Sequence, residues 1–228
     1  MANISLKLGR HPQTEPIDEV IISWTKGINV QRLKTFLKGE GALSSSEQAL
    51  WEAYKDKTEW LYCFAGHLDD VHSVNECYDV DENAKIALKA FSLSRDNVDE
   101  TRIYYGRDVK LDIGKVVEQK LKERIKQHFE DGTYLEHYRN SAIICFPEYI
   151  QINRGEYIGE FCGEYKDDFI DALETILIKG NAEKSFHRLG VCNDMKKVNP
   201  QLFYPIRKVS NITYNLGAME KEINVNIE

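Results

Sequence analysis

Apolar residues at helical spacing dominate the first third of the chain. In NVQRLKTFLKGEG, Val30, Leu33 and Leu37 share one helical face before a glycine stop signal. PIDEVIISWTKG has a proline suited to a first helical turn, then acidic residues, then a terminal glycine. SSSEQALWEAYKDKTEWLYCFAGH opens on a capping box of Ser45 and Gln48. This pattern predicts a helix-rich N-terminal third, with helices over 16–27, 29–41 and 44–67.

Three later segments also repeat apolar residues at helical spacing. Val117, Leu121, Ile125 and Phe129 lie four residues apart, which places them on one helical face. In YKDDFIDALETILIKGN the period continues until Gly180, which we expect to end the helix. The helices predicted from this spacing cover 81–91, 113–132 and 165–181.

Short alternating or continuously apolar runs predict strands in the rest of the chain. SAIICF is continuously apolar and is bounded by Pro147, which is typical of a buried strand. YIQINRGEYIGEF has two alternating halves around Arg154 and Gly155, which indicates a hairpin. The predicted strands are 4–8, 91–94, 109–113, 141–146, 149–161, 202–209, 211–216 and 222–227.

The order of these elements predicts an α+β fold with a mixed, mainly antiparallel sheet. A chain of 228 residues is long enough to bury a substantial core, and no repeat or linker divides it. A hydrophobic content of 42% and an aromatic content of 11% argue against disorder. We therefore expect one domain over residues 1–228, with a helical subregion at 14–70.

Charge and apolar content restrict the partners and the cellular location that we expect for the protein. The net charge is −7, and basic residues are interleaved with acids, as in KVVEQKLKERIKQHFED, which disfavours non-specific binding to nucleic acid. No apolar run approaches the ~20 residues of a membrane helix, and the first residues lack the features of a signal peptide. The five cysteines include no CxxC pair, which argues against a structural zinc site or a disulfide framework. We expect a soluble cytoplasmic protein that does not associate with membranes.

The segment AFSLSRDNVDETRIYYG most simply predicts a strand, a turn and a second strand. FSLS followed by RIYYG also resembles an uncharacterised bacterial domain family, whose pattern is F-S-x-S, a polar loop and W-R-x-Y-G. Members of that family occur in bacterial or phage settings connected with defence, so the resemblance implies such a setting and names no reaction. The matching residues are Phe91, Ser92, Ser94, Arg102, Tyr105 and Gly106, with Thr101 in place of the family's tryptophan.

A fainter resemblance connects three distant places in the chain. Arg10 follows the first strand, FSLS lies near the middle, and EKE opens the last strand; this order is similar to that of ADP-ribosyltransferases. The resemblance implies NAD as cofactor, with an arginine on its pyrophosphate and a glutamate that stabilises an oxocarbenium-like transition state. The alternative is that these are ordinary surface residues. The implied cofactor-binding set is Arg10, Ser92, Ser94 and Arg102, and the implied catalytic set is Glu222 and Glu220.

The segment GHLDDVH places imidazole and carboxylate donors close together. Such donors can bind a divalent metal ion, and the segment looks like the H-P-D-D motif of zinc-dependent deacetylases, with Leu68 in place of proline. The resemblance implies a metal-dependent hydrolase with His67, Asp70 and His72 as ligands. The alternative is a helix end at Gly66 followed by a turn.

Carboxylates also gather between residues 148 and 164. Buried pairs of this kind can act as acid and base when their pKa values are pushed apart. The alternative is the solvated face of a hairpin. The residues concerned are Glu148, Glu156, Glu160 and Glu164.

Two classes of function follow from these patterns. The first, which we favour, is a protein-binding module in a defence or counter-defence setting, because interfaces are enriched in tyrosine and tryptophan. The second is an NAD-using, ADP-ribosyltransferase-like enzyme. The aromatic residues expected to supply a binding surface are Trp51, Trp60, Tyr104, Tyr105, Tyr149 and Tyr157.

Overall fold

The computed structural model describes residues 2–6, 17–66, 109–130, 141–154, 157–160, 167–182, 189–191, 206–216 and 219–227. Within these ranges the chain forms four helices and eleven strands, and the strands make two mixed β-sheets. The predicted α+β class is confirmed. Strand pairs are mainly antiparallel, as expected, although two sheets are present where one was predicted.

The six-stranded sheet brings the first and last strands of the chain together. Its order is β1 (Ala2–Leu6), β11 (Met219–Ile227), β10 (Lys208–Leu216), β2 (Glu19–Trp24), β7 (Pro147–Arg154) and β8 (Tyr157–Glu160). The pairs β1–β11 and β10–β2 are parallel, and the remaining pairs are antiparallel. In β2, Val20, Ile22 and Trp24 are buried, because alternate side chains of a strand face the same side.

The five-stranded sheet has β4 at its centre. Its order is β3 (Ile28–Asn29), β6 (Ile143–Cys145), β4 (Trp60–Gly66), β5 (Val109–Val116) and β9 (Leu189–Val191). Every residue of β4 is buried, which explains why WLYCFAG reads as one continuous apolar run. Of the pairs in this sheet, β5–β9 is parallel and the others are antiparallel.

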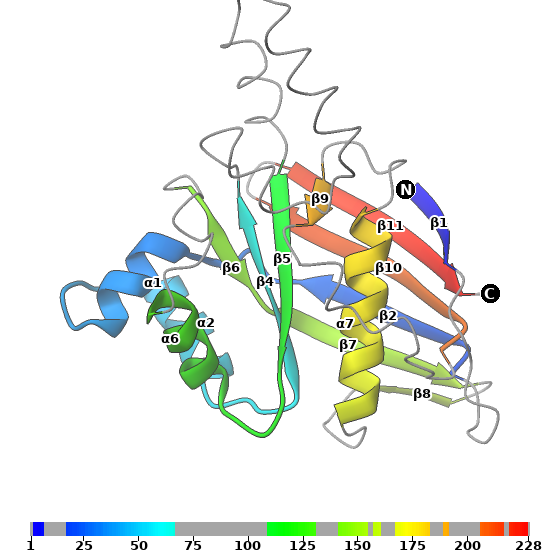
Figure 1. The fold of residues 1–228 in the computed structure, drawn as a ribbon, viewed down its shortest axis with the longest axis horizontal. Coiled ribbons are helices and arrows are strands. Elements are labelled where there is room, and N and C mark those ends of the chain that lie inside the picture. Colours follow the sequence, from blue (N-terminus) through cyan, green and yellow to red (C-terminus); the bar gives the residue numbers. More distant parts are fainter. Residues whose placement is uncertain are drawn as a thin grey trace, which may run out of the picture.

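The two sheets are connected through a bent pair of strands. β2 leads into β3 and β6 leads into β7, and the backbone N–H of Thr25 donates to Phe146 O at 2.9 Å between them. Gly27 has φ +85°, and a Cβ there would lie 2.7 Å from Ile144 O, so this position requires glycine. The strands of the two sheets consequently cross at a steep angle, as in orthogonal packing (Figure 1).

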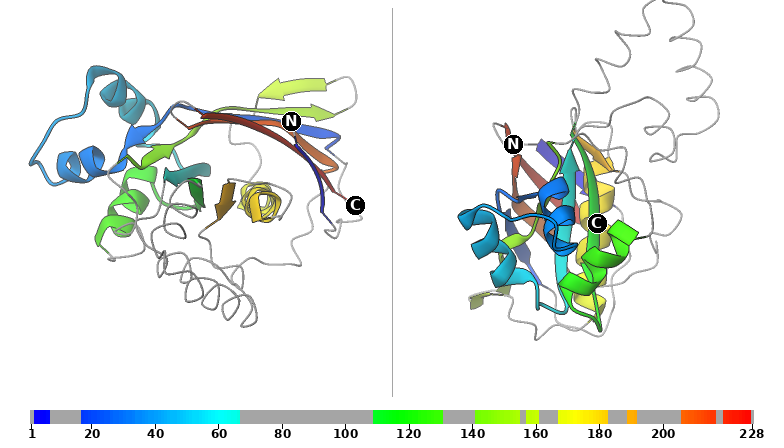
Figure 2. Two further views of the ribbon diagram at one scale, coloured as in Figure 1. Left: turned by 90° about the horizontal axis from the view of Figure 1, so that it is seen from above. Right: turned by 90° about the vertical axis from the view of Figure 1, so that its left-hand side faces the viewer.

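The helices cover the five-stranded sheet and fill the space beneath the six-stranded one. α7 (Asp167–Ala182) lies inside the curve of the larger sheet, where Figure 2 (left) shows it end-on, and Gly180 brings it close to Val225. The buried residues of both sheets and α7 form one continuous hydrophobic cluster. The other described helices are α1 (Val30–Leu37), α2 (Ser45–Tyr54) and α6 (Leu121–Glu130).

The prediction of a helix-rich N-terminal third is wrong. Residues 19–24 form β2, in which the apolar side chains Val20, Ile22 and Trp24 lie on one face and are buried with period two. The first helix begins only at residue 30.

Two other predicted helices are shorter than expected. The helix predicted over 44–67 ends at Tyr54, and after a turn in which Glu59 has φ +45° the chain enters β4. The predicted capping box lies one residue earlier, on Ser44 and Glu47. The helix predicted over 113–132 begins only at Leu121, because residues 113–116 continue β5.

Several other predicted elements are confirmed. α1 ends before Gly39, which has φ +78°, and the strands predicted at 109–113 and 141–146 correspond to β5 and β6. The hairpin around Arg154 is formed by β7 and β8, and α7 continues two residues beyond Gly180. The segments 81–91 and 91–94 lie outside the described residues. None of the described helices is long and apolar enough to cross a membrane.

Candidate functional site

α2 is fixed at its start by a carboxylate that accepts several hydrogen bonds. Glu47 caps the helix reciprocally with Ser44, and its Oε1 accepts from Asn29 N at 3.0 Å and Arg32 Nη2 at 2.7 Å. Burial opposes ionisation of Glu47, but the hydrogen bonds from Asn29, Ser44 and Arg32 outweigh it and lower the pKa to about 2. One ionised side chain therefore ties α2 to the start of α1.

The last turn of α2 carries a tyrosine onto the bend between the sheets. The ring of Tyr54 stacks on Phe146 at 5.0 Å between centroids, with 19° between planes. In the following turn, Lys57 N donates to Tyr54 O at 2.9 Å, and Lys57 O accepts from Leu121 N at 2.9 Å. These bonds hold the turn between α2, β4 and the first residues of α6.

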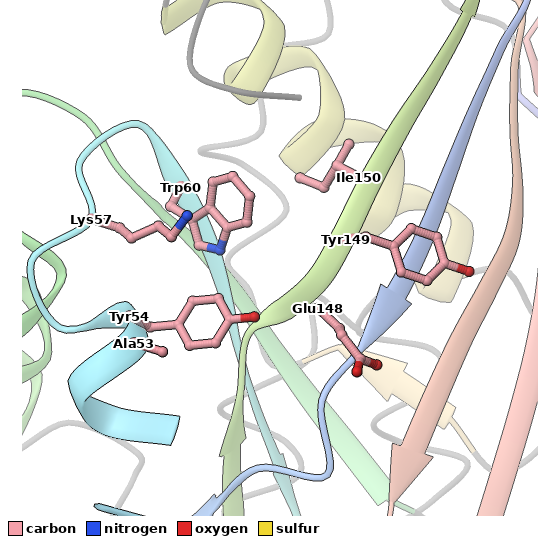
Figure 3. A pocket seen from close by; sticks show the side chains of 7 residues that line it. All are labelled: Ala53, Tyr54, Lys57, Trp60, Glu148, Tyr149 and Ile150. Atoms are coloured by element: carbon pink, nitrogen blue, oxygen red, sulfur yellow. The ribbon is translucent and has the colours of Figure 1, made fainter. Parts of the chain in front are cut away.

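A pocket of about 270 Å³ opens between this turn and β7. Figure 3 shows Tyr54, Lys57 and Trp60 on one side, and Glu148 and Tyr149 on the other, with the Tyr54 hydroxyl directed toward β7. Tyr149, with 39% of its surface exposed, is the one large hydrophobic residue that is exposed among those described. The complete lining is Ala53, Tyr54, Lys57, Trp60, Glu148, Tyr149 and Ile150.

The aromatic side of this pocket already holds a cation. Lys57 Nζ lies 4.3 Å from the centroid of the Trp60 ring and 5.8 Å from that of Tyr54. Such a contact is a cation–π interaction, in which the negative ring face attracts the ammonium group. Burial and the negative charge of Glu148 together raise the pKa of Tyr54. The pocket therefore combines three aromatic side chains, one ammonium group and one carboxylate.

A second group of polar side chains, which we call the Tyr62 network, lies under α6. The Tyr62 hydroxyl is 2.6 Å from His128 Nε2 and accepts from Arg124 Nε at 3.4 Å. The Tyr62 ring lies on Gly114, where a Cβ would come within 2.3 Å of it. Burial, with a smaller effect of Asp112, raises the pKa of Tyr62. The phenol therefore stays neutral, and its hydroxyl connects β4 to α6 through hydrogen bonds.

Charged side chains of β5 and α7 surround this network. Lys115 contacts Asp171 and lies 3.2 Å from Glu174 Oε2. Burial raises the pKa of Glu174 although Lys115 opposes the shift, whereas for Lys115 the effects of Asp171 and Glu174 outweigh burial and raise its pKa. Asp171 is the better-solvated partner, so the ammonium charge is balanced mainly there. These groups satisfy one another, which is typical of a structural ionic cluster.

Only some of the site residues predicted from the sequence lie within the described part of the chain. Glu222 is exposed on β11 beside Thr213 of β10, and Glu220 pairs in register with Asn215. The shared NAD cleft and the metal site therefore stay predictions. Among the described residues, no three potential metal ligands cluster together. The positions outside the described residues are Arg10, Ser92, Ser94, Arg102, His67, Asp70 and His72.

The aromatic and acidic predictions have a mixed outcome. Tyr149 is exposed at the pocket, whereas Trp51 and Trp60 are 3% and 7% exposed and both belong to the core. The predicted surface role of Trp51 is therefore wrong, and Trp60 lines the pocket with only a small part of its surface. Glu148 lines the pocket without a second carboxylate, Glu160 lies in β8, and Glu156 and Glu164 fall outside the described residues. Tyr104, Tyr105 and Tyr157 are residues about whose side chains the structure says nothing.

No sequence pattern predicts the roles of Tyr54 and Lys57. Their partners on β7 lie about ninety residues further along the chain, and no spacing rule connects the two segments. Among known proteins, no family model matches the chain, and no curated protein or solved structure matches it. The chemistry of the pocket is therefore the basis for proposing a function.

Proposed function

We propose that this protein is a binding module that recognises a segment of a partner protein through the aromatic pocket. The observation that carries the proposal is a preformed hollow whose rim exposes Tyr149 and whose wall contains Tyr54 and Trp60. Tyrosine and tryptophan are favoured at protein interfaces, since they offer a large apolar area at low entropic cost. A volume of about 270 Å³ suits one or two side chains rather than a large cofactor.

The electrostatics of the two polar regions also favour binding over catalysis at the pocket. Its one carboxylate, Glu148, is exposed on β7, and no second carboxylate lines the pocket to act as its acid or base partner. Asp171 and Glu174, which lie beside the Tyr62 network, are balanced by Lys115. A recognition surface needs only complementary shape and charge, and the pocket offers both.

The proposal can be tested with peptides displayed on phage. The folded full chain is used to select from a library of random linear peptides, and the selected peptides are then measured against Glu148→Gln and Tyr149→Ser. We expect both variants to lose affinity for the selected peptides. Glu222→Gln is the matched control, because it makes the same chemical change on an exposed strand residue separated from β7 by β10 and β2.

Selection of peptides that bind the wild type and Glu222→Gln equally, but bind the two pocket variants weakly, would support the proposal. If no peptide is selected, or if the selected peptides ignore Tyr149 and Glu148, the pocket is not a recognition site for a protein segment.

A further inference from the structure

We propose that the group which the pocket recognises is a cation, the arginine or lysine side chain of the partner segment, and that Lys57 occupies its place in the free protein. The proposal rests on the proposed function and specifies the ligand of the same pocket. In the free protein, Lys57 Nζ sits 4.3 Å from the centroid of the Trp60 ring. The aromatic faces are thus arranged to hold a positive charge, and the protein's own lysine shows where that charge sits.

Lys57 can leave the ring without disturbing the fold. Its side chain is exposed, while its backbone is fixed by the bonds to Tyr54 O and from Leu121 N. Among the residues that the structure describes, no carboxylate forms an ion pair with Lys57, so its ammonium group is held by the rings alone. A ring–cation contact at an exposed site favours the closed arrangement by only about 2–5-fold. A competing cation can therefore replace it.

The opposite wall of the pocket selects the sign of the incoming charge. Glu148 lines the pocket and is exposed on β7, with its carboxylate directed away from Trp60 (Figure 3). Its charge is felt at the Tyr54 hydroxyl, since it contributes to the raised pKa of that group. The chain as a whole carries a net charge of −7, which attracts cations to its surface. An anionic guest would be repelled by Glu148 and by the net negative charge of the chain.

In this geometry Lys57 competes with the guest cation for the Trp60 ring. While it covers Trp60, only the fraction of molecules with an open ring can bind the guest, and the observed affinity falls by that fraction. Removing the Lys57 side chain should accordingly tighten binding of a cationic guest by about 3–6-fold, the inverse of the open fraction. A lysine that instead formed part of the binding site would give the opposite result.

The experiment uses small probes that differ only in charge. Ethylguanidinium and its neutral isostere ethylurea are titrated into the full-length protein, and the three tryptophan indole N–H signals are followed by NMR. We expect ethylguanidinium to shift one indole signal and to compete with the pocket-dependent peptides, while ethylurea does neither. Lys57→Ala should bind ethylguanidinium about 3–6-fold more tightly, and Glu148→Gln should bind it more weakly.

Lys126→Ala provides the matched control, because it removes one exposed positive charge from α6 and does not line the pocket. If Lys57→Ala and Lys126→Ala gain the same affinity for ethylguanidinium, the gain comes from the change in net charge alone. That result would overturn the inference. Equal binding of ethylurea, or weaker binding by Lys57→Ala, would also overturn it. If the selected peptides depend on the pocket but lack arginine and lysine, only the cation inference fails. If no peptide depends on the pocket, the proposed function fails as well.

Discussion

Trp60 and Tyr62 lie two residues apart on the same face of β4, yet they belong to regions with opposite character. Trp60 forms a wall of the aromatic pocket, and its ring is approached by the movable Lys57 side chain. Tyr62 is 1% exposed, and its hydroxyl is held by His128 and Arg124 under α6. Both are large aromatic residues at the end of one strand.

The difference between the two regions is what covers each ring. α6 packs over Tyr62 and supplies its hydrogen-bond partners, so the Tyr62 hydroxyl is satisfied within the fold and the Tyr62 network contributes to stability. The first residues of α6 only brace the turn next to Trp60. The Trp60 ring there contacts Tyr54 and the exposed Lys57 side chain, and a partner can replace Lys57. Substitutions in the Tyr62 network should consequently affect folding, and those in the pocket should affect binding.

The largest effect is expected from Gly114→Ala, which inserts a methyl group beneath Tyr62. The new Cβ would lie 2.3 Å from atoms of a ring that is already packed against Phe64 and His128. We expect the free energy of unfolding to fall by about 3 kcal/mol in urea denaturation. Gly39→Ala is the control: its φ is +78° but its surroundings are open, so only backbone strain of about 1 kcal/mol is expected. Equal losses would mean that the Tyr62 ring can move aside.

The next largest effect concerns the support of the pocket. Glu47→Gln removes the charge that anchors α2, and we expect a loss of about 2–3 kcal/mol at pH 7. The folded-state pKa of Glu47 is about 2, below its ordinary value of 4.5, so the stabilisation is complete above pH 4.5 and declines as the pH falls toward 2. Stability measured from pH 7 to pH 3 should therefore show the wild type and the variant converging in acid.

Glu52→Gln serves as the control for that experiment. Glu52 lies on the same helix and forms an exposed ion pair with Lys55, which is worth less than about 1 kcal/mol. A pH profile of Glu47→Gln parallel to that of the wild type would contradict the assigned role of the Glu47 carboxylate.

A smaller effect is expected when the two tyrosines lose their hydroxyl groups. Tyr62→Phe leaves His128 and Arg124 without their shared partner, and we expect it to cost about 1–2 kcal/mol of unfolding free energy. Tyr54→Phe removes a hydroxyl that faces the pocket, so its effect should remain within about 0.5 kcal/mol. Thermal or urea denaturation compares the pair directly. If both variants lose the same stability, the contrast between the two regions is wrong.

The smallest change in stability is expected for Tyr149→Ser. The side chain is exposed at the rim of the pocket, so the free energy of unfolding should change by less than about 0.5 kcal/mol. The same variant should lose most of its affinity for pocket-dependent peptides. A destabilised Tyr149→Ser protein would indicate that the residue belongs to the sheet packing and not to a recognition surface.

Local patterns predicted the elements that have one dominant signal. The apolar run of SAIICF, the turn residues Arg154 and Gly155, and the glycine after α1 each identify a single structure. β2 was predicted as a helix because Pro16 and Gly27 looked like helix boundaries, although Val20, Ile21 and Ile22 are β-branched and favour a strand. In that segment the tertiary pairing with β7 and β10 outweighed the end signals.

The sequence predicts some of the residues of the pocket but not their arrangement. Trp60 and Tyr149 stand out in the sequence as aromatic residues suited to an interface, and Glu148 as a member of an acidic group. Their convergence depends on the bend at Thr25 and Phe146, which brings the end of α2 against the start of β7. A bend shared by two sheets follows from long-range pairing and leaves no periodic pattern in either segment.

The same bend makes the pocket sensitive to the shape of the whole molecule. Tyr54 rests on Phe146 at the crease between the sheets, and the opposite wall of the pocket begins two residues later, at Glu148. A guest that separates these walls must open the crease, and a change in the crease angle must widen or narrow the pocket. The spacing of the two pocket walls is therefore set by the angle at which the two sheets meet.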